Sequence, residues 1–246
     1  YMYSLVSQRV EVSEPRLVSR SRGYHWFPAM ERFADGSLVA IINDYRDDHV
    51  DHPTEQLTFS RDGGWTWTPP VRYDFCEQIF VTLESGDLLL LPYHITALHD
   101  GMGGAYKIVR HGAHEVGADD TGVTVTGWER GCGTRGKTHF TNFSFHGQSL
   151  RARDGRYLAT LYGCYEGTVK NTVVLAESND GLNWRVISTI APDSYEHACA
   201  DGPSESALVR LADGRLMCVY RITSFQPMGV SYSNDDGRTW TAPRRI

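Results

Sequence analysis

The sequence has 246 residues, of which 41% are hydrophobic and 22% charged, proportions typical of a globular protein with room for a sizeable core. The net charge of −6 argues against nucleic acid as the main partner, because phosphate binding needs clustered lysine and arginine. The longest apolar runs, such as residues 88–91, are far too short to span a bilayer, so we expect no membrane span.

The five cysteines are scattered along the chain at positions 76, 132, 164, 199 and 218, and no C-x-x-C occurs. They therefore indicate neither a disulfide framework nor a structural zinc site, and they leave the cellular compartment open. The absence of a signal peptide is uninformative here because residue 1 is a tyrosine. We expect a secreted or periplasmic location.

Four tight turns are predicted along the chain, each between two segments that are expected to be strands. Asp35-Gly36, Ser85-Gly86, Asp154-Gly155 and Asp213-Gly214 each lie between apolar, strand-like runs, which is the strongest short-range signal for a β-hairpin. Residues 1–21 precede the first hairpin and are expected to form a polar strand. The glycine-rich residues 100–104 are expected to form a loop.

A second motif follows each hairpin by roughly 20 to 30 residues. Residues 60–67 and 233–240 read S-x-D-x-G-x-T-W, and residues 178–184 repeat the pattern with one residue deleted. Residues 118–125 keep only the Asp, Gly and Thr. Ser, Asp and Gly favour a tight turn, and Trp supplies an apolar anchor beneath it. We therefore expect a fold-back between two strands at each copy.

The two signals together predict a repeating unit of strand, hairpin turn, strand, loop, strand, box and strand. The copies start at 60, 118, 178 and 233, and a fixed period of this size means one supersecondary unit repeated. The sequence predicts an all-β fold, a β-propeller of four-stranded antiparallel blades in a single domain over 1–246. The expected blades cover about 23–74, 75–136, 137–191 and 201–246.

The S-x-D-x-G-x-T-W pattern resembles the Asp box (BNR repeat) of the sialidase, or neuraminidase, superfamily. That resemblance implies a propeller closing at six blades, with a glycosidase site in its central funnel. Four repeats would then leave the domain incomplete at its C-terminus, so we expect a truncated piece, a second chain or self-association to cover the open faces. The alternative is a self-contained four-bladed ring closed by residues 1–21.

The resemblance also suggests site residues. Glu205 precedes Arg221 by 16 residues across the last hairpin. This spacing is similar to that between two sialidase residues: a glutamate that polarises a tyrosine nucleophile, and an arginine that binds the substrate carboxylate. Asp51 lies five residues past Arg46, as the sialidase acid/base aspartate does, with Asp48 in reserve. The alternative explanation is a structural salt bridge for the first pair and a solvated acidic loop for the second.

Two departures from the family pattern stand beside these matches. Trp26 occupies the place of the first sialidase arginine, where it would either stack on a sugar or pack in the core. The third arginine and the tyrosine nucleophile have no counterpart in the chain. His146 on the inner strand of the third blade is a further candidate for substrate binding, and Arg135 and Lys137 could add cationic contacts.

The favoured function is glycan processing by a sialidase-like glycoside hydrolase on an acidic or polar terminal sugar, with Asp51 and Glu205 catalytic. No cofactor is expected, and no metal, although His49/His52 and His111/His114 have ligand-like spacing. Two alternatives stay open. One is a polysaccharide lyase that uses His146 or His49 with Arg221 on a uronate, and the other is a non-catalytic glycan-binding propeller.

Overall fold

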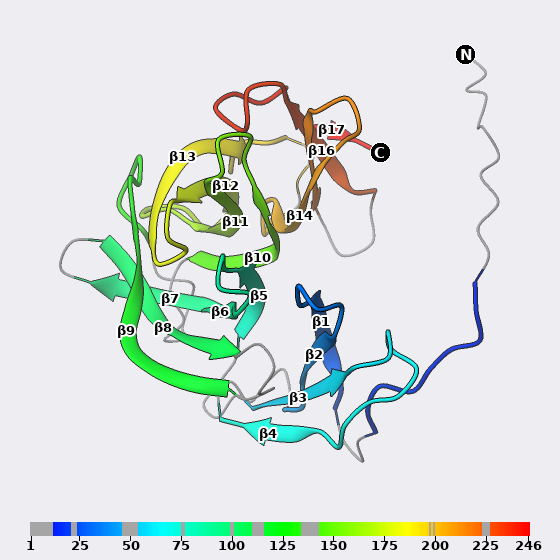
Figure 1. The fold of residues 1–246 in the computed structure, drawn as a ribbon. Helices are drawn as coiled ribbons and strands as arrows, with labels where there is room; N and C mark the ends of the chain where they lie inside the picture. Colours follow the sequence, from blue (N-terminus) through cyan, green and yellow to red (C-terminus); the bar gives the residue numbers. More distant parts are fainter. Residues whose placement is uncertain are drawn as a thin grey trace.

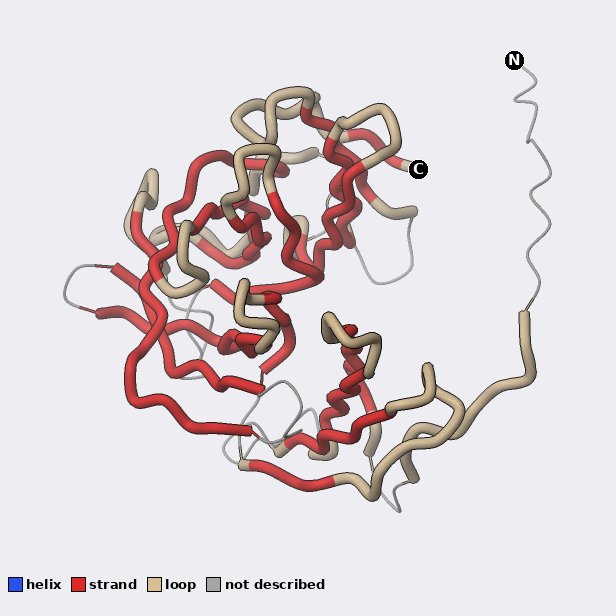
Figure 2. Tube along the Cα trace, viewed as in Figure 1, coloured by secondary structure: helices blue, strands red, loops and turns tan. Residues whose placement is uncertain are grey.

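A computed structural model describes residues 12–20, 24–45, 54–74, 77–98, 101–109, 116–133, 143–196, 198, 200–222 and 227–246. Among these residues there are strands and loops but no helix (Figure 2). Accordingly, no described helix is long and apolar enough to cross a membrane. The all-β prediction is confirmed.

The strands form successive antiparallel blades around an arc (Figure 1). Blade one is β1 Trp26–Arg32, β2 Leu38–Asn43, β3 Glu55–Ser60 and β4 Val71–Tyr73. Blade two is β5 Glu77–Thr82, β6 Leu88–Pro92, β7 His94–Leu98, β8 Gly101–Val109 and β9 Val116–Thr126. Blade three is β10 Phe143–Arg151, β11 Tyr157–Cys164, β12 Asn171–Ser178 and β13 Asn183–Ala191, and blade four is β14 Ser204–Arg210, β15 Leu216–Arg221, β16 Gly229–Ser233 and β17 Arg244–Arg245.

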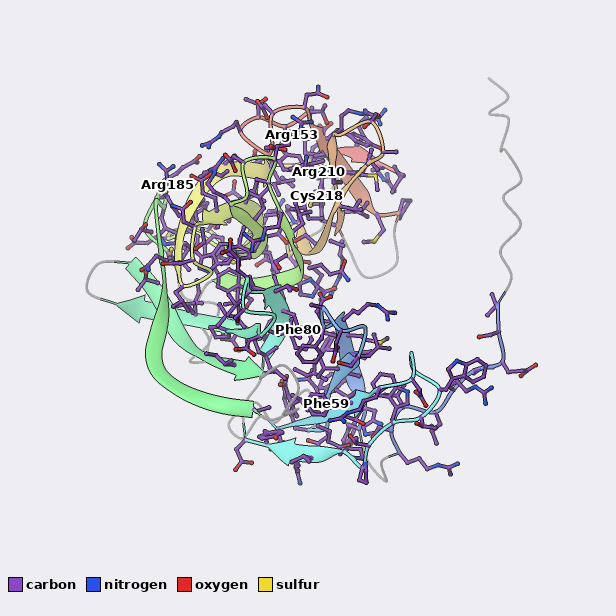
Figure 3. All side chains as sticks on the ribbon, viewed as in Figure 1. Phe59, Phe80, Arg153, Arg185, Arg210 and Cys218 are labelled. Atoms are coloured by element: carbon purple, nitrogen blue, oxygen red, sulfur yellow. The ribbon has the colours of Figure 1, made fainter. Side chains whose placement is uncertain are left out.

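Three apolar clusters hold the arc together, one between each pair of neighbouring blades. Phe59 of blade one and Phe80 of blade two lie in the first of them (Figure 3). Cys218 of blade four lies in the last, against blade three. Strands β2, β6, β11 and β12 are buried along their whole length. Their continuous apolar runs therefore reflect burial on both faces of the blade.

The three well-preserved boxes form the expected turns. In residues 60–67 the Ser60 hydroxyl accepts a hydrogen bond from the Gly64 N–H at 2.8 Å, and the Asp62 carboxylate accepts the Thr66 N–H and hydroxyl at 2.9 and 2.6 Å. The tryptophan that ends the box donates its indole N–H to the carbonyl of the box glycine, at 3.1 Å for Trp67. Trp184 and Trp240 make the same contact at 2.7 and 3.1 Å.

The fourth, degraded copy was predicted wrongly. Residues 118–125 lie inside strand β9, which pairs with β8 on one side and, in parallel, with β13 on the other. This copy has neither the serine hydroxyl that binds the turn N–H nor the tryptophan that anchors it. Without those two groups the segment extends as a strand.

Blade two differs from the others in a second way. Strand β7 pairs with β8 and also with β10 of blade three, so blades two and three form one nine-stranded sheet. The predicted loop over residues 100–104 is also wrong where it is described, because β8 begins at Gly101. A Cβ on Gly104 would approach Pro92 to 3.0 Å, so the glycine reflects a close strand approach.

The N-terminal segment does not form the expected strand over its described part. Residues 12–20 are irregular and lie on blade one, where the Ser19 hydroxyl donates to Gln56 Oε1 at 3.1 Å and the Arg16 guanidinium sits 4.3 Å above the Trp65 ring. Among the described strands, none of blade four pairs with blade one. The expectation that residues 1–21 close the ring against blade four is therefore not supported by their described part.

Candidate functional site

The first strands of the blades, β1, β5, β10 and β14, line the centre of the arc (Figure 1). They run in the same sense, so their starting residues gather at one end of the central funnel. Glu205 lies at the start of β14, and Arg221 ends β15 beside it. The Arg221 guanidinium donates to Glu205 Oε1 at 2.6 Å. The contact expected from their 16-residue spacing is therefore present.

The backbone at Glu205 is strained. The β14–β15 pairing shifts between Ser204 and Ser206, and Glu205 in this bulge has φ of +36°. A non-glycine residue with left-handed backbone costs about 1–3 kcal/mol and persists only where its surroundings hold it. The hydrogen bond from Arg221 raises the pKa of that guanidinium, against the effect of burial. The pair is therefore a carboxyl group fixed against a guanidinium, with each side chain about a third exposed.

His146 lies on β10, with its ring pressed against blade four. Its Nδ1 is 3.2 Å from the Ser206 carbonyl oxygen. A carbonyl can only accept, so Nδ1 carries the proton and Nε2 keeps its lone pair. Burial lowers the pKa of His146, while the Ser206 hydrogen bond and the charge of Glu205 act in the opposite direction. His146 is thus a neutral imidazole whose Nε2 can act as a hydrogen-bond acceptor.

Trp26 begins β1, at the same end of the funnel, but it is not the exposed ring. Its indole stacks on the Phe27 ring with centroids 4.9 Å apart and planes 22° apart, and Tyr45 meets it edge-on. The indole nitrogen is buried without a hydrogen-bond partner among the described residues. Phe27, with φ of +43°, is the ring that reaches the surface.

A cavity of about 740 Å³ runs along the inner strands. Blade one lines it with Phe27–Arg32 and Leu38, blade two with Phe80, and blade three with His146, Gly147 and Gln148. A Cβ on Gly147 would approach the Ser206 carbonyl oxygen to 2.3 Å. The glycine therefore lets blade three approach blade four closely at the point where His146 makes its hydrogen bond.

Several predicted site residues lie outside the described part of the chain: Arg46, Asp48, Asp51, Arg135 and Lys137. The histidine pairs at 49/52 and 111/114 lie outside it too. Their proposed roles stay predictions. Within the described ranges no group of three or more His, Cys, Asp or Glu side chains is placed to hold a metal ion.

Two tyrosines that the sequence interpretation missed also belong to the site. The Tyr162 hydroxyl is 2.6 Å from the Tyr93 hydroxyl, and the Tyr162 ring meets the His146 ring edge-on with centroids 5.6 Å apart. His146 in turn contacts the Ser206 carbonyl, next to Glu205 in the chain. A hydroxyl pair thus links blades two and three beside the Glu205–Arg221 contact.

A simple signal could have found these tyrosines. Each lies seven residues past its hairpin glycine, at the position that Arg221 holds in blade four and Asn43 in blade one. The 16-residue step between Glu205 and Arg221 recurs in every blade, in the pairs Phe27/Asn43, Glu77/Tyr93 and His146/Tyr162. The chain therefore repeats two equivalent positions in every blade, one on the first strand and one on or just after the second.

No protein-family model and no curated protein matches the sequence. Among solved structures, a protein of unknown function from Dyadobacter fermentans is similar with a TM-score of 0.69 and 18% identity, covering 93% of this chain and 71% of its own. The Hadza microbial sialidase Hz136 has a TM-score of 0.61 and 13% identity, covering 88% of this chain and 46% of its own.

An α-L-arabinanase of Penicillium chrysogenum in complex with arabinobiose has a TM-score of 0.59 and 16% identity, covering 90% of this chain and 66% of its own. This chain therefore spans between about half and two thirds of the length of the glycosidase structures it matches. Identities this low establish the fold alone. The chain has the sialidase-like β-propeller fold, which it shares with glycoside hydrolases.

Proposed function

We propose that this chain carries the substrate funnel of a sialidase-like glycoside hydrolase that acts on an acidic or polar terminal sugar. The observation that carries the proposal is the 2.6 Å contact between Arg221 and Glu205 in a strained bulge at the funnel. Backbone strain held at a concave surface by a charged pair is typical of functional sites. The matched structures, a sialidase and an arabinanase with bound arabinobiose, add support from carbohydrate chemistry on the same fold.

Each residue in the proposal has a defined role. Glu205, oriented by Arg221, would polarise the nucleophile of the reaction. The Arg221 guanidinium, a planar donor group, would bind a carboxylate or hydroxyl of the sugar. Asp51 would act as the acid/base, in keeping with its step from Arg46 in the sequence.

The test uses 4-methylumbelliferyl glycosides of N-acetylneuraminic acid, glucuronic acid and L-arabinofuranose. We expect the purified protein to release the fluorophore from one of them and Glu205→Gln to lower kcat by about 100-fold or more. Asp213→Asn is the matched control, because it makes the same charge change in an exposed arginine pair on the same blade, 2.8 Å from Arg215. Equal loss in both variants, or no effect of Glu205→Gln, would refute the assignment.

A polysaccharide lyase is the second candidate, favoured by one observation. The neutral His146 ring touches Tyr162, whose hydroxyl is bound to that of Tyr93. A histidine base and a tyrosine acid are the groups that proton abstraction beside a uronate requires. A lyase would release an unsaturated product that absorbs in the ultraviolet, and His146→Ala would abolish that signal. Binding of a glycan without turnover would instead indicate a non-catalytic propeller.

A further inference from the structure

One aromatic ring in the cavity along the inner strands, called the axial cavity below, combines solvent exposure with an unusual backbone conformation. Phe27 is 43% exposed and lines the cavity wall formed by β1. Its φ of +43° is in the left-handed region that phenylalanine rarely adopts. Among the described residues only two other non-glycine positions share that region, and one of them is Glu205.

Phe27 and Glu205 are equivalent positions in their blades. Each lies nine residues before the glycine of its hairpin turn, and each belongs to a bulge at the start of an inner strand. In blade four this bulge directs a carboxylate to its arginine. In blade one the same strained bulge holds a phenyl ring at the cavity surface instead.

The ring is held from behind. The Trp26 indole stacks beneath it at 4.9 Å, and Tyr45 braces the indole from its edge. Two aromatic residues thus fix the plane of Phe27, which is what a stacking platform needs and a loosely exposed side chain lacks. The sequence left open whether Trp26 stacks on a sugar or packs in the core, and the structure makes it the support of Phe27.

Polar groups line the same cavity from blade three. His146 holds the position equivalent to Phe27, nine residues before its hairpin glycine, and Gln148 follows it on β10. His146 Nδ1 donates its proton to the Ser206 carbonyl, so Nε2 is unprotonated and can accept a hydrogen bond. The cavity therefore combines an exposed aromatic ring on blade one with hydrogen-bonding groups on blade three, and Glu31 and Arg32 of blade one add further polar groups. Such a combination is suited to a sugar ring with one C–H face and several hydroxyls.

We propose that the axial cavity is a sugar-ring subsite in which Phe27 stacks on the C–H face of the sugar and His146 Nε2 accepts a hydrogen bond from a hydroxyl. This inference rests on the proposed carbohydrate function. It adds Phe27 as a specificity-determining residue, and it separates ring recognition in the cavity from the charge chemistry of Glu205 and Arg221.

Two substitutions at one position test the inference. Phe27→Ala and Phe27→Gly both remove the ring, but only glycine adopts positive φ without strain. Affinity is measured by isothermal titration with sialyllactose, glucuronoxylan oligosaccharides, arabinobiose and cellobiose, and stability by urea unfolding. We expect both variants to lose about tenfold in affinity for the bound sugar, while Phe27→Gly is at least as stable as Phe27→Ala.

Trp65→Ala is the control, because Trp65 is a 62% exposed aromatic residue on the same blade that does not line the cavity. The Trp65→Ala variant should leave sugar affinity unchanged.

If the unaltered protein binds none of the four sugars, the proposed function and this inference both fail. If it binds one of them and the Phe27 variants bind equally well, only the inference fails. A change of oligomeric state in the Phe27 variants without a loss of affinity would likewise overturn it, because the ring would then serve an interface.

Discussion

The hydroxyl groups of Tyr93 and Tyr162 lie 2.6 Å apart, although 69 residues separate them in the chain. Tyr93 directly follows β6, and Tyr162 lies near the end of β11. The Tyr162 ring also meets His146, whose Nδ1 contacts the Ser206 carbonyl of blade four. Residues of three consecutive blades thus meet at one end of the funnel. A propeller brings them together because each blade repeats the same strand order around a common axis.

Replacing Tyr162 by phenylalanine should therefore affect stability and activity together. The variant loses the hydrogen bond to Tyr93, and we expect the free energy of unfolding to fall by about 0.5–1.5 kcal/mol. Tyr220→Phe is the control, since it removes a similar buried bond, 2.9 Å to Ser231, within blade four. Urea unfolding should show comparable losses, whereas only Tyr162→Phe should reduce glycoside hydrolysis. Unchanged hydrolysis in both would exclude the tyrosine pair from the site.

Two glycines of blade three allow the cost of backbone strain to be measured separately from the cost of a steric clash. Gly147 and Gly155 have φ of +82° and +89°, but a Cβ on Gly147 would lie 2.3 Å from the Ser206 carbonyl oxygen, whereas one on Gly155 meets nothing within 4 Å. We expect Gly155→Ala to cost about 1 kcal/mol and Gly147→Ala about 2–4 kcal/mol in urea unfolding. Equal costs would mean that blades three and four do not approach as closely as the structure indicates.

A buried carboxylate joins blades three and four on their outer side. Glu177 of β12 contacts the guanidinium groups of Arg156, Arg185 and Arg238, the last of which belongs to the box of blade four. Because Glu177 is 7% exposed, Glu177→Gln leaves three cations around a neutral amide. We expect a loss of about 2–4 kcal/mol in unfolding free energy. Asp154→Asn, which removes only an exposed partner of Arg156, should leave the unfolding midpoint unchanged; an equal loss would refute the special role of Glu177.

Acidification should destabilise the protein through His146. Burial holds the pKa of this imidazole below its ordinary value of 6.5, so the unfolded chain takes up a proton at a higher pH than the folded chain. The contribution of the neutral ring is complete above pH 6.5 and is lost as the pH falls toward the lowered folded pKa. Thermal unfolding between pH 7 and 5 should show a steeper loss for the unaltered protein than for His146→Gln. Parallel curves would contradict this account.

The boxes and the Glu205–Arg221 contact could be predicted from the sequence because both depend on short-range geometry. A serine, an aspartate and a glycine within five residues make their own turn, as the bonds of Asp62 show. A 16-residue step across a two-stranded hairpin places its ends side by side. The turn predicted at the degraded copy in β9 was wrong for the same reason. Without the hydrogen-bonding serine and the anchoring tryptophan, the local interactions that stabilise the turn are missing.

The sequence by itself therefore determined the repeating unit, the propeller fold and the pairing of Glu205 with Arg221. Only the tertiary structure decided which groups meet across blades, since these contacts join segments about 60 residues apart whose approach depends on packing between sheets. It fixed the proton of His146 on Nδ1 through the carbonyl of Ser206. Local patterns carry no information on contacts across blades, because the angle and separation of neighbouring blades are set by the buried side chains between them. Within blade one, the tertiary structure also decided that Phe27 is the exposed ring and Trp26 its support.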